Sequence, residues 1–331
     1  MLNNKIGTEG AKAVADALRV NGVVATLDLS FNNISPEGAI AIAEALKVNG
    51  GLTALDLSSN DLKDEGVSAV CKAIQSNKET KLASLNVKKN GIGSIGANAV
   101  AAMVAVTGVL TVTNLLGNQL DAESAKMLAE VTKQKGISLC GIQRDQTTAY
   151  FSRQGLKPTD AILLASDLSQ AGVTGSLTKM SLADNELGEE GTKAICEALE
   201  QNKTLKELGL SGGYPSYNNI GGAAGAMHVA NMLGVNGGLT TINLSSNQLC
   251  GVWTDHDGVQ QGTYTAEGIT AIADALRVNG GLTSLNLSNS QLCGVTDLGS
   301  GTYTTEGITA IAEALRVNGG LTKMRYVSPQ T

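Results

Sequence analysis

Aromatic residues are scarce in this sequence: one Trp, six Tyr and two Phe make nine among 331 residues. Hydrophobic residues are nevertheless 42% of the chain, so any core must be aliphatic. Charged residues are only 16%, with a net charge of −6 and no low-complexity block, which argues against a disordered chain. No stretch reaches the roughly 20 apolar residues that a membrane span needs, and the first residues lack the apolar core of a signal peptide. We therefore expect a folded protein with no membrane partner.

Motifs for catalysis and for metal binding are also missing. The chain has two histidines, His228 and His256, and five cysteines without disulfide-like spacing. It contains no Walker motif, no H-E-x-x-H and no paired C-x-x-C, and the G-x-G-x-x-G match at 91–96 lacks the acidic residue of a dinucleotide site. We expect no enzyme, hence no catalytic residue, no metal and no cofactor. The odd number of cysteines favours a reducing, cytoplasmic location.

An internal repeat dominates the sequence. Its frame is L-x-x-L-x-L-x-x-N-x-[LI] followed by a helical stretch, and clear copies begin at Val23, Leu52 and Leu282. The apolar positions alternate as in a strand that is buried on one face. We expect the asparagine of the frame, called the anchor below, to turn the chain and to hydrogen-bond backbone in the loop. The anchors are Asn4, Asn32, Asn60, Asn90, Asn118, Asn185, Asn218 and Asn247, and Ser290 takes the same place in the next repeat.

The helical part of each repeat has start and stop signals. Ser35, Pro36 and Glu37 form the pattern of an N-cap, a first-turn proline and a first-turn acid. Asn49 and Gly50 are residues that tolerate the left-handed conformation at which helices end. A Glu-Gly pair recurs near the helix starts and predicts a close backbone approach. Its glycines are Gly10, Gly38, Gly66, Gly191, Gly268 and Gly307.

These repeats resemble the leucine-rich repeats of the ribonuclease-inhibitor subclass. That subclass also occurs in NOD-like receptors, in the GTPase-activating protein of Ran and in stand-alone algal and protist proteins. The resemblance covers nearly the whole chain and implies a single leucine-rich-repeat solenoid over residues 1–331. The implied fold is an α/β horseshoe of about ten β-α units, with a parallel inner sheet and outer α-helices.

The frame is irregular in the unit that spans residues 136–176. In one register Ile137 and Cys140 lie in the strand and Asp145 is the anchor. In the other register the strand comes later and Gln154 is the anchor. Both registers lead into the same helix. We favour the first register, followed by an inserted loop.

Three insertions interrupt the array, at residues 212–218, 250–265 and 293–304. The second and third are near-copies in adjacent repeats, so we expect these two loops to lie side by side. Cys250 and Cys293 occupy equivalent positions in them. Whether these two cysteines ever form a disulfide is left open by the pattern.

The two tandem insertions hold three of the nine aromatic residues. A Gly-Thr-Tyr-Thr sequence precedes the next helix in both, which predicts that Tyr264 and Tyr303 pack back onto the scaffold. Trp253 and His256 are then expected at an exposed tip. Loops on rigid scaffolds often carry function, and Trp gives a large contact area, so Trp253 and His256 are candidate partner contacts.

The outward side chains of the strands are expected to line the concave face, the usual binding surface of a solenoid. Most of these side chains are small and polar, but basic and apolar residues break the ladder in one patch. The candidate contacts there are Lys88, Lys89, Leu116, Leu139, Gln143, Arg144 and Lys179. This patch predicts a partner with an acidic or mixed apolar surface, while the face as a whole is too weakly basic for nucleic acid.

We therefore expect a non-catalytic protein-protein interaction scaffold that binds a protein partner through the concave face, the tandem insertions or both. One alternative is a regulator of a small GTPase, by analogy to the Ran activator, although no motif here carries that activity. Another alternative is a fragment or subunit of a larger receptor or assembly.

Overall fold

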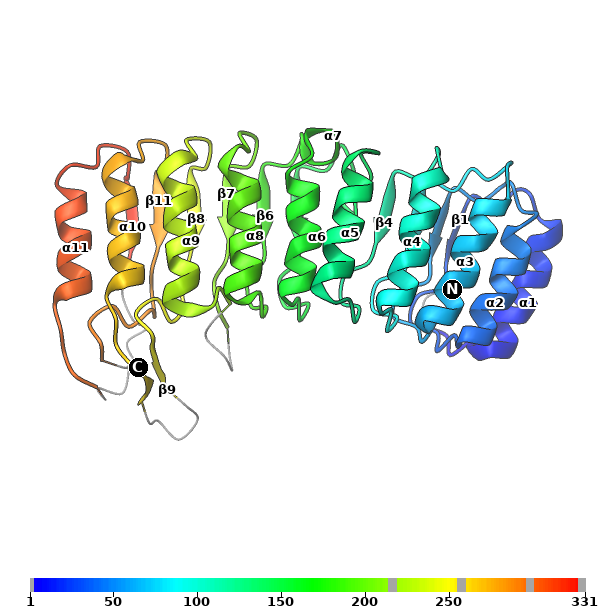
Figure 1. Cartoon of the computed structure of the whole chain (residues 1–331), viewed down its shortest axis with the longest axis horizontal. Coiled ribbons are helices and arrows are strands. Elements are labelled where there is room, and N and C mark those ends of the chain that lie inside the picture. The colour runs from blue at the N-terminus through cyan, green and yellow to red at the C-terminus, as the bar shows by residue number, and fades with distance from the viewer. Residues whose placement is uncertain (1–2, 214–218, 255–259, 296–300, 327–331) are drawn as a thin grey trace. The chain divides into compact units, whose positions relative to one another are not determined.

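The computed structural model describes residues 3–213, 219–254, 260–295 and 301–326, and in these residues helices alternate with short strands (Figure 1). The helices are α1 (Gly7–Val20), α2 (Pro36–Leu46), α3 (Lys63–Ser76), α4 (Ser94–Val106), α5 (Ala122–Lys133), α6 (Pro158–Leu168), α7 (Ala171–Thr174), α8 (Gly188–Glu200), α9 (Gly222–Val235), α10 (Glu267–Val278) and α11 (Glu306–Leu315). The strands are β1 (Thr26–Asp28), β2 (Ala54–Asp56), β3 (Ser84–Asn86), β4 (Val112–Asn114), β5 (Thr148–Tyr150), β6 (Lys179–Ser181), β7 (Glu207–Gly209), β8 (Thr241–Asn243), β9 (Val252–Thr254), β10 (Gln260–Gly262), β11 (Ser284–Asn286) and β12 (Lys323–Arg325).

The parallel strands form two sheets. One has the order β1-β2-β3-β4 and the other the order β12-β11-β8-β7-β6-β5, while β9 and β10 form a separate antiparallel hairpin. The chain correspondingly falls into two compact units. The N-terminal unit comprises Met1–Arg144 and Ile162–Val173, and the C-terminal unit comprises Asp145–Ala161 and Thr174–Thr331. Both units are α/β solenoids of stacked repeats, but the expected single inner sheet is replaced by two.

The second sheet begins with the strand that we did not favour from sequence. β5 pairs in register with β6, and the backbone N–H of Gln154 donates to Oδ1 of Asn185 (3.1 Å), as it does at a regular anchor position. Asp145, which we expected as the anchor, is exposed, so that prediction is wrong. The later register holds because it alone places an inward apolar strand beside β6.

The earlier segment nevertheless acts as a strand in the N-terminal unit. Ser138 forms an isolated bridge with Val112, and Cys140 forms one with Asn114. Both partners lie in β4, so this segment extends the first sheet. The irregular unit therefore contains two strand-like segments, of which each serves a different sheet.

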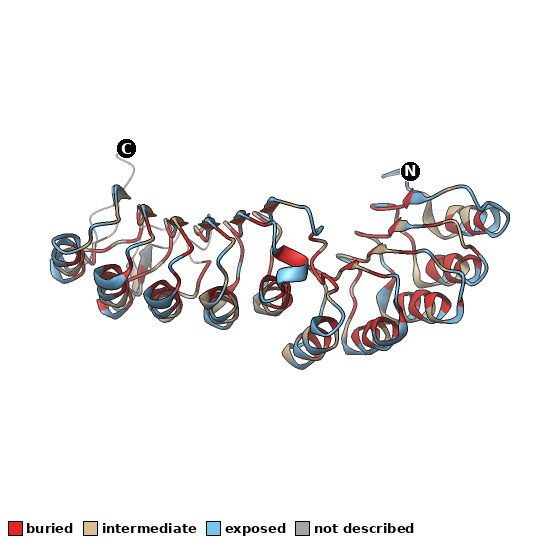
Figure 2. Cartoon of the chain, turned by 90° about the horizontal axis from the view of Figure 1, so that it is seen from above, coloured by how far each residue is buried: buried red, intermediate tan, exposed pale blue. Residues whose placement is uncertain are grey.

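In both units the apolar core lies between the strand layer and the helix layer, where buried residues face each other (Figure 2). Leu29, Ile34 and Ile42 are fully buried there. The start of α2 confirms the expected signals, because Ser35 accepts the backbone N–H of Gly38 (3.4 Å) and Pro36 occupies the first turn. The layers are aliphatic, in agreement with the composition.

The recurrent Glu-Gly glycines stand where neighbouring helices almost touch. A Cβ atom on Gly66 would lie 2.8 Å from the Cβ atom of Ala39 in the preceding helix. On Gly191 it would lie 2.9 Å from Ala161. These distances are shorter than side chains tolerate, so the predicted close approach is confirmed and explains the glycines.

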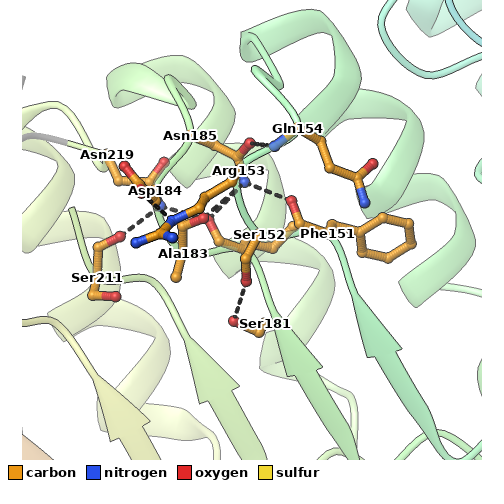
Figure 3. Close-up of polar contacts among 11 residues, drawn as sticks. Phe151, Ser152, Arg153, Gln154, Ser181, Ala183, Asp184, Asn185, Ser211 and Asn219 are labelled. Carbon is orange, nitrogen blue, oxygen red and sulfur yellow. Dashed lines mark hydrogen bonds and ion pairs between the residues drawn. The ribbon is translucent and has the colours of Figure 1, made fainter. Parts of the chain in front are cut away.

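The anchor side chains tie each loop to its neighbours (Figure 3). Nδ2 of Asn185 donates to the carbonyl oxygen of Phe151 in the preceding repeat (2.9 Å), and its Oδ1 accepts the N–H of Gln154. The expected role of the anchors is therefore confirmed. In the next repeat, Asn219 is the buried anchor rather than Asn218, because the insertion before it shifts the frame by one residue.

Candidate partner-binding surfaces

The strand face of the N-terminal unit contains a groove of about 360 Å³. Its floor consists of the side chains that β1 to β4 turn away from the helices, together with Gly141 and Gln143. In the register of the sheet, Asp28 lies beside Asp56, Asp56 beside Asn86, and Asn86 beside Asn114. The groove, called the N-terminal groove below, therefore has carboxylates at one end and carboxamides towards the other.

The side chains of this row stabilise the ends of their own strands. In each, Oδ1 accepts the backbone N–H two residues further along the chain, at 2.8 to 3.2 Å. An amide oxygen performs this task as well as a carboxylate oxygen does, since both are good acceptors. The residues that share this contact are Asp28, Asp56, Asn86 and Asn114 in the N-terminal unit and Asn243 and Asn286 in the C-terminal unit.

The two carboxylates of the groove accept hydrogen bonds from neutral side chains. Oγ of Ser30 donates to Oδ1 of Asp28 (2.6 Å), and this hydrogen bond lowers the pKa of the Asp28 carboxyl below its ordinary value. Nδ2 of Asn86 donates to Oδ2 of Asp56 (2.8 Å). Within the described part of the chain, no Lys, Arg or His side chain forms an ion pair with Asp28 or Asp56. The groove thus presents two adjacent negative charges.

The basic part of the predicted patch lies in the same unit. Lys89, Gln143 and Arg144 are exposed, and Lys88 is half-buried. Lys88 follows β3, two residues after Asn86, and so lies at the end of the groove's third strand. The N-terminal unit therefore carries basic residues near the row of side chains that contains Asp28 and Asp56.

The apolar part of the predicted patch is wrong. Leu116 and Leu139 both have an exposed fraction of 0%. Leu116 occupies the same strand position as Ser30 and Ser58, which are also buried, because the loop that holds the anchor folds over this position. Leu139 is also buried, and its backbone N–H donates to the carboxylate of Asp167 (2.8 Å) on α6. Neither leucine offers a surface to a partner.

Lys179, the remaining residue of the patch, belongs to the C-terminal unit. On β6 its ammonium lies 2.8 Å from the carboxylate of Glu207 on β7, and that hydrogen bond raises the pKa of Lys179. Tyr150, whose backbone pairs with Ser181, is 66% exposed on the neighbouring strand β5. This face therefore carries an ion pair between two of its own strands and the exposed ring of Tyr150. The register that we favoured from sequence did not put Tyr150 in a strand.

A second ion pair lies where β5 and β6 end (Figure 3). Nε of Arg153 donates to Oδ2 of Asp184 (2.7 Å). The hydroxyl groups of Ser152, two residues after β5, and Ser181, the last residue of β6, are 2.7 Å apart. Charges on this part of the C-terminal unit are thus matched across adjacent repeats.

The first tandem insertion contains the hairpin β9–β10, in which the backbone of Trp253 pairs with Gln261. His256 lies outside the described residues, so the exposed tip stays a prediction. Oη of Tyr264 donates to the carbonyl oxygen of Leu292 (3.3 Å), which confirms that Tyr264 packs on the scaffold. Tyr303 is 65% exposed, so the same prediction for it is wrong. The two tyrosines differ because the second insertion covers Tyr264, whereas the described residues after Tyr303 contain no further insertion that could cover Tyr303.

The cysteines are free and mostly buried. Burial raises the pKa of the Cys71 and Cys250 thiols to about 12, so both stay protonated and unreactive near neutral pH. Nε2 of His228 on α9 lies 3.7 Å from Oε1 of Glu189 on the neighbouring helix α8. Over the described ranges, no three His, Cys, Asp or Glu side chains are grouped to hold a metal ion, and no helix has the length and apolarity to cross a membrane.

Sequence reasoning missed the buried carboxylate of Asp167, near the end of α6. It accepts hydrogen bonds from the N–H groups of Leu139 (2.8 Å) and Cys140 (3.1 Å) and from Oγ of Ser138 (2.7 Å). Burial raises its pKa to about 6 in spite of these donors. Asp167 holds the strand-like segment of the irregular unit against α6. An acid two residues after the apolar run at 161–165, on the same helix, was the signal that could have revealed it.

Stacked β-α repeats with parallel strands define a solenoid repeat protein, and comparisons with known proteins identify the kind of repeat. A family model described as "Leucine Rich repeat" matches residues 24–43, 52–71 and 78–101. The human protein "NACHT, LRR and PYD domains-containing protein 3" is 28% identical over 142 residues, which are 43% of this chain and 13% of that protein. The match thus spans roughly an eighth of the relative's length. Residues 24–101 of this chain thus contain leucine-rich repeats.

A solved structure titled "Leiomodin-1 Actin-Binding Site 2 (ABS2)" also matches. It shares 17% sequence identity with this chain and has a TM-score of 0.35. The match covers 38% of this chain and 75% of that one.

Proposed function

We propose that this protein is a non-catalytic scaffold that binds a protein partner through the strand face of its repeats. Leucine-rich repeats are in general protein-interaction scaffolds. The observation that supports this function best is the N-terminal groove, a hollow of about 360 Å³ whose polar side chains are held in fixed positions by backbone hydrogen bonds. Preorganised side chains lose little conformational freedom on binding, which favours affinity.

The contact residues that we propose are the exposed or half-exposed members of the patch: Lys88, Lys89, Gln143 and Arg144. Bases at this place favour a partner with acidic groups, and raised salt should weaken such binding. Trp253 and His256 in the first tandem insertion are a second proposed contact.

Affinity capture from native lysate with quantitative mass spectrometry tests the strand face. We expect the variant Lys88→Glu/Lys89→Glu to lose a partner that the parent protein captures. The matched control is Lys72→Glu/Lys78→Glu, which changes the net charge equally at exposed positions in α3 and in the loop after it. Equal capture by both variants and the parent would exclude this patch.

The insertion is tested separately, by replacing 252–262 with a tight turn and measuring both capture and thermal melting. Loss of a partner without a change in melting supports contact through the insertion. Unchanged capture excludes that contact, and a lowered melting temperature shows that the hairpin contributes to the fold.

A further inference from the structure

The charges of the N-terminal groove are not required by the strand that carries them. Asp28 and Asp56 accept the same backbone N–H bond that an asparagine accepts in four other repeats. Asparagine has nearly the same shape and brings no charge. The backbone contact at these two positions therefore needs one acceptor oxygen but not the negative charge, and only the second oxygen of Asp56 has a further contact, with Nδ2 of Asn86 (2.8 Å).

The two charges also lie on adjacent strands, where they repel each other. Asp28 and Asp56 stand directly beside each other on β1 and β2, and like charges opposite one another on adjacent strands are destabilising. Strands lie about 4.8 Å apart, a distance at which two partly buried charges repel appreciably. At Asp28 the hydrogen bond from Ser30 offsets this repulsion, because it lowers the pKa of that carboxyl below its ordinary value.

The groove is moreover polarised along the sheet. Its acids lie on β1 and β2, and Lys88 and Lys89 directly follow β3. Two strand steps separate β1 from β3, which is roughly 10 Å. Three residues of an extended peptide span about the same distance. The groove is therefore matched in charge and in length to a short extended segment.

We propose that the N-terminal groove binds an extended segment of the protein partner in which a basic side chain and an acidic side chain are three residues apart. The basic group lies over Asp28 and Asp56, where its N–H groups meet two carboxylates in charge-assisted hydrogen bonds. The acidic group lies beside Lys88 and Lys89. At the β4 end of the groove, the carboxamide of Asn114 binds the segment's backbone. This inference rests on the proposed function and specifies the chemistry of the partner.

A random dodecapeptide library displayed on phage and selected on the full chain tests the inference. We expect enrichment of Arg or Lys with Asp or Glu three positions away. A selected peptide is then labelled, and its affinity is measured by fluorescence anisotropy. Asp28→Asn/Asp56→Asn should weaken binding at least tenfold, because it removes both charges and keeps both acceptor oxygens. The matched control Asp16→Asn/Glu130→Gln changes the net charge equally on α1 and α5 and should change affinity less than twofold.

Replacing the peptide's arginine by citrulline, its neutral analogue, completes a double-mutant cycle. Citrulline should weaken binding to the parent protein and have little further effect on Asp28→Asn/Asp56→Asn. Additive losses would overturn the inference, as would a selection without enriched charges or one that yields no binding peptide. If the inference fails but partner capture still depends on Lys88 and Lys89, the proposed function stands. If partner capture does not depend on these lysines either, both the inference and the proposed function are refuted.

Discussion

The strand faces of the two units carry charge in different ways. In the C-terminal unit, Lys179 pairs with Glu207 across adjacent strands, and Arg153 pairs with Asp184. In the N-terminal unit, Asp28 and Asp56 lie side by side, and no basic side chain in the described residues pairs with them. The repeat and the strand geometry are the same in both units. The comparison teaches that the solenoid tolerates either arrangement: the charges of these C-terminal residues neutralise each other, whereas within the described residues Asp28 and Asp56 have no ion pair with a basic side chain.

The largest expected effect tests whether the two units are also separate in stability. Leu29→Asp in the N-terminal unit and Leu208→Asp in the C-terminal unit each bury a charge at a position that is at most 1% exposed. We expect a loss of roughly 4–5 kcal/mol or more in each case. Hydrogen exchange should show lost protection in the first three repeats for Leu29→Asp, and around β6 to β8 for Leu208→Asp. Protection lost throughout the chain for either variant would show one cooperative structure.

The second effect distinguishes the units by pH. Burial raises the pKa of Asp167 from 3.8 to about 6. The stability that this shift contributes to the folded protein is therefore fully present below about pH 3.8 and is lost as the pH rises through about 6. Between pH 7.5 and pH 4, the N-terminal unit of the parent should gain up to about 3 kcal/mol over that of Asp167→Asn, since one pKa unit corresponds to 1.36 kcal/mol. Urea unfolding across this pH range measures the difference. Parallel pH profiles for parent and variant would contradict the raised pKa.

A smaller effect compares the two equivalent tyrosines of the C-terminal unit. Tyr264→Phe removes a hydrogen bond to Leu292 and should cost about 1 kcal/mol. Tyr303→Phe alters a side chain that is 65% exposed and should leave stability within about 0.5 kcal/mol of the parent. Chemical denaturation of both variants decides the matter. Equal losses would mean that Tyr303 packs as Tyr264 does.

The smallest effect returns to the charges of the two strand faces. Lys179→Ala breaks an ion pair whose side chains are 45% and 46% exposed, so we expect a loss between 0 and about 1 kcal/mol. Asp28→Asn/Asp56→Asn keeps both backbone acceptors but replaces the oxygen of Asp56 that accepts Nδ2 of Asn86, so we expect a loss of no more than about 1 kcal/mol. Thermal melting in low salt, where surface charges are least screened, compares the two. A clear destabilisation by Asp28→Asn/Asp56→Asn would show that these carboxylates serve the fold.

The sequence predicted those features that depend on contacts repeated in every unit. The cap at Ser35, the close approach at Gly66 and the anchor bonds of Asn185 all follow from local patterns that recur along the chain. Where the pattern was unique, prediction was less accurate. The register after Lys135 was misjudged because two segments of similar composition competed for one strand position, and the structure uses both.

The candidate site was predicted less completely than the fold. Lys88, Lys89, Gln143 and Arg144 are accessible, at least in part, as expected, whereas Leu116 and Leu139 are buried. Strand alternation places Leu116 on the outer side of the sheet, but it does not show that the anchor loop covers that position. Burial depends on the neighbouring repeat, and single-repeat patterns carry no information about it.

By itself, the sequence determined the repeat, the alternation of strand and helix, and the aliphatic core, because each of these depends on residues a few positions apart. Only the tertiary structure decided that the strands form two sheets, that Asp167 is a buried acceptor and that Asp28 and Asp56 stand together without a basic partner in the described residues. Those features arise from residues 27 or more positions apart, which stacking brings into contact. Periodicity specifies what each repeat is, and packing between repeats specifies what its side chains contact.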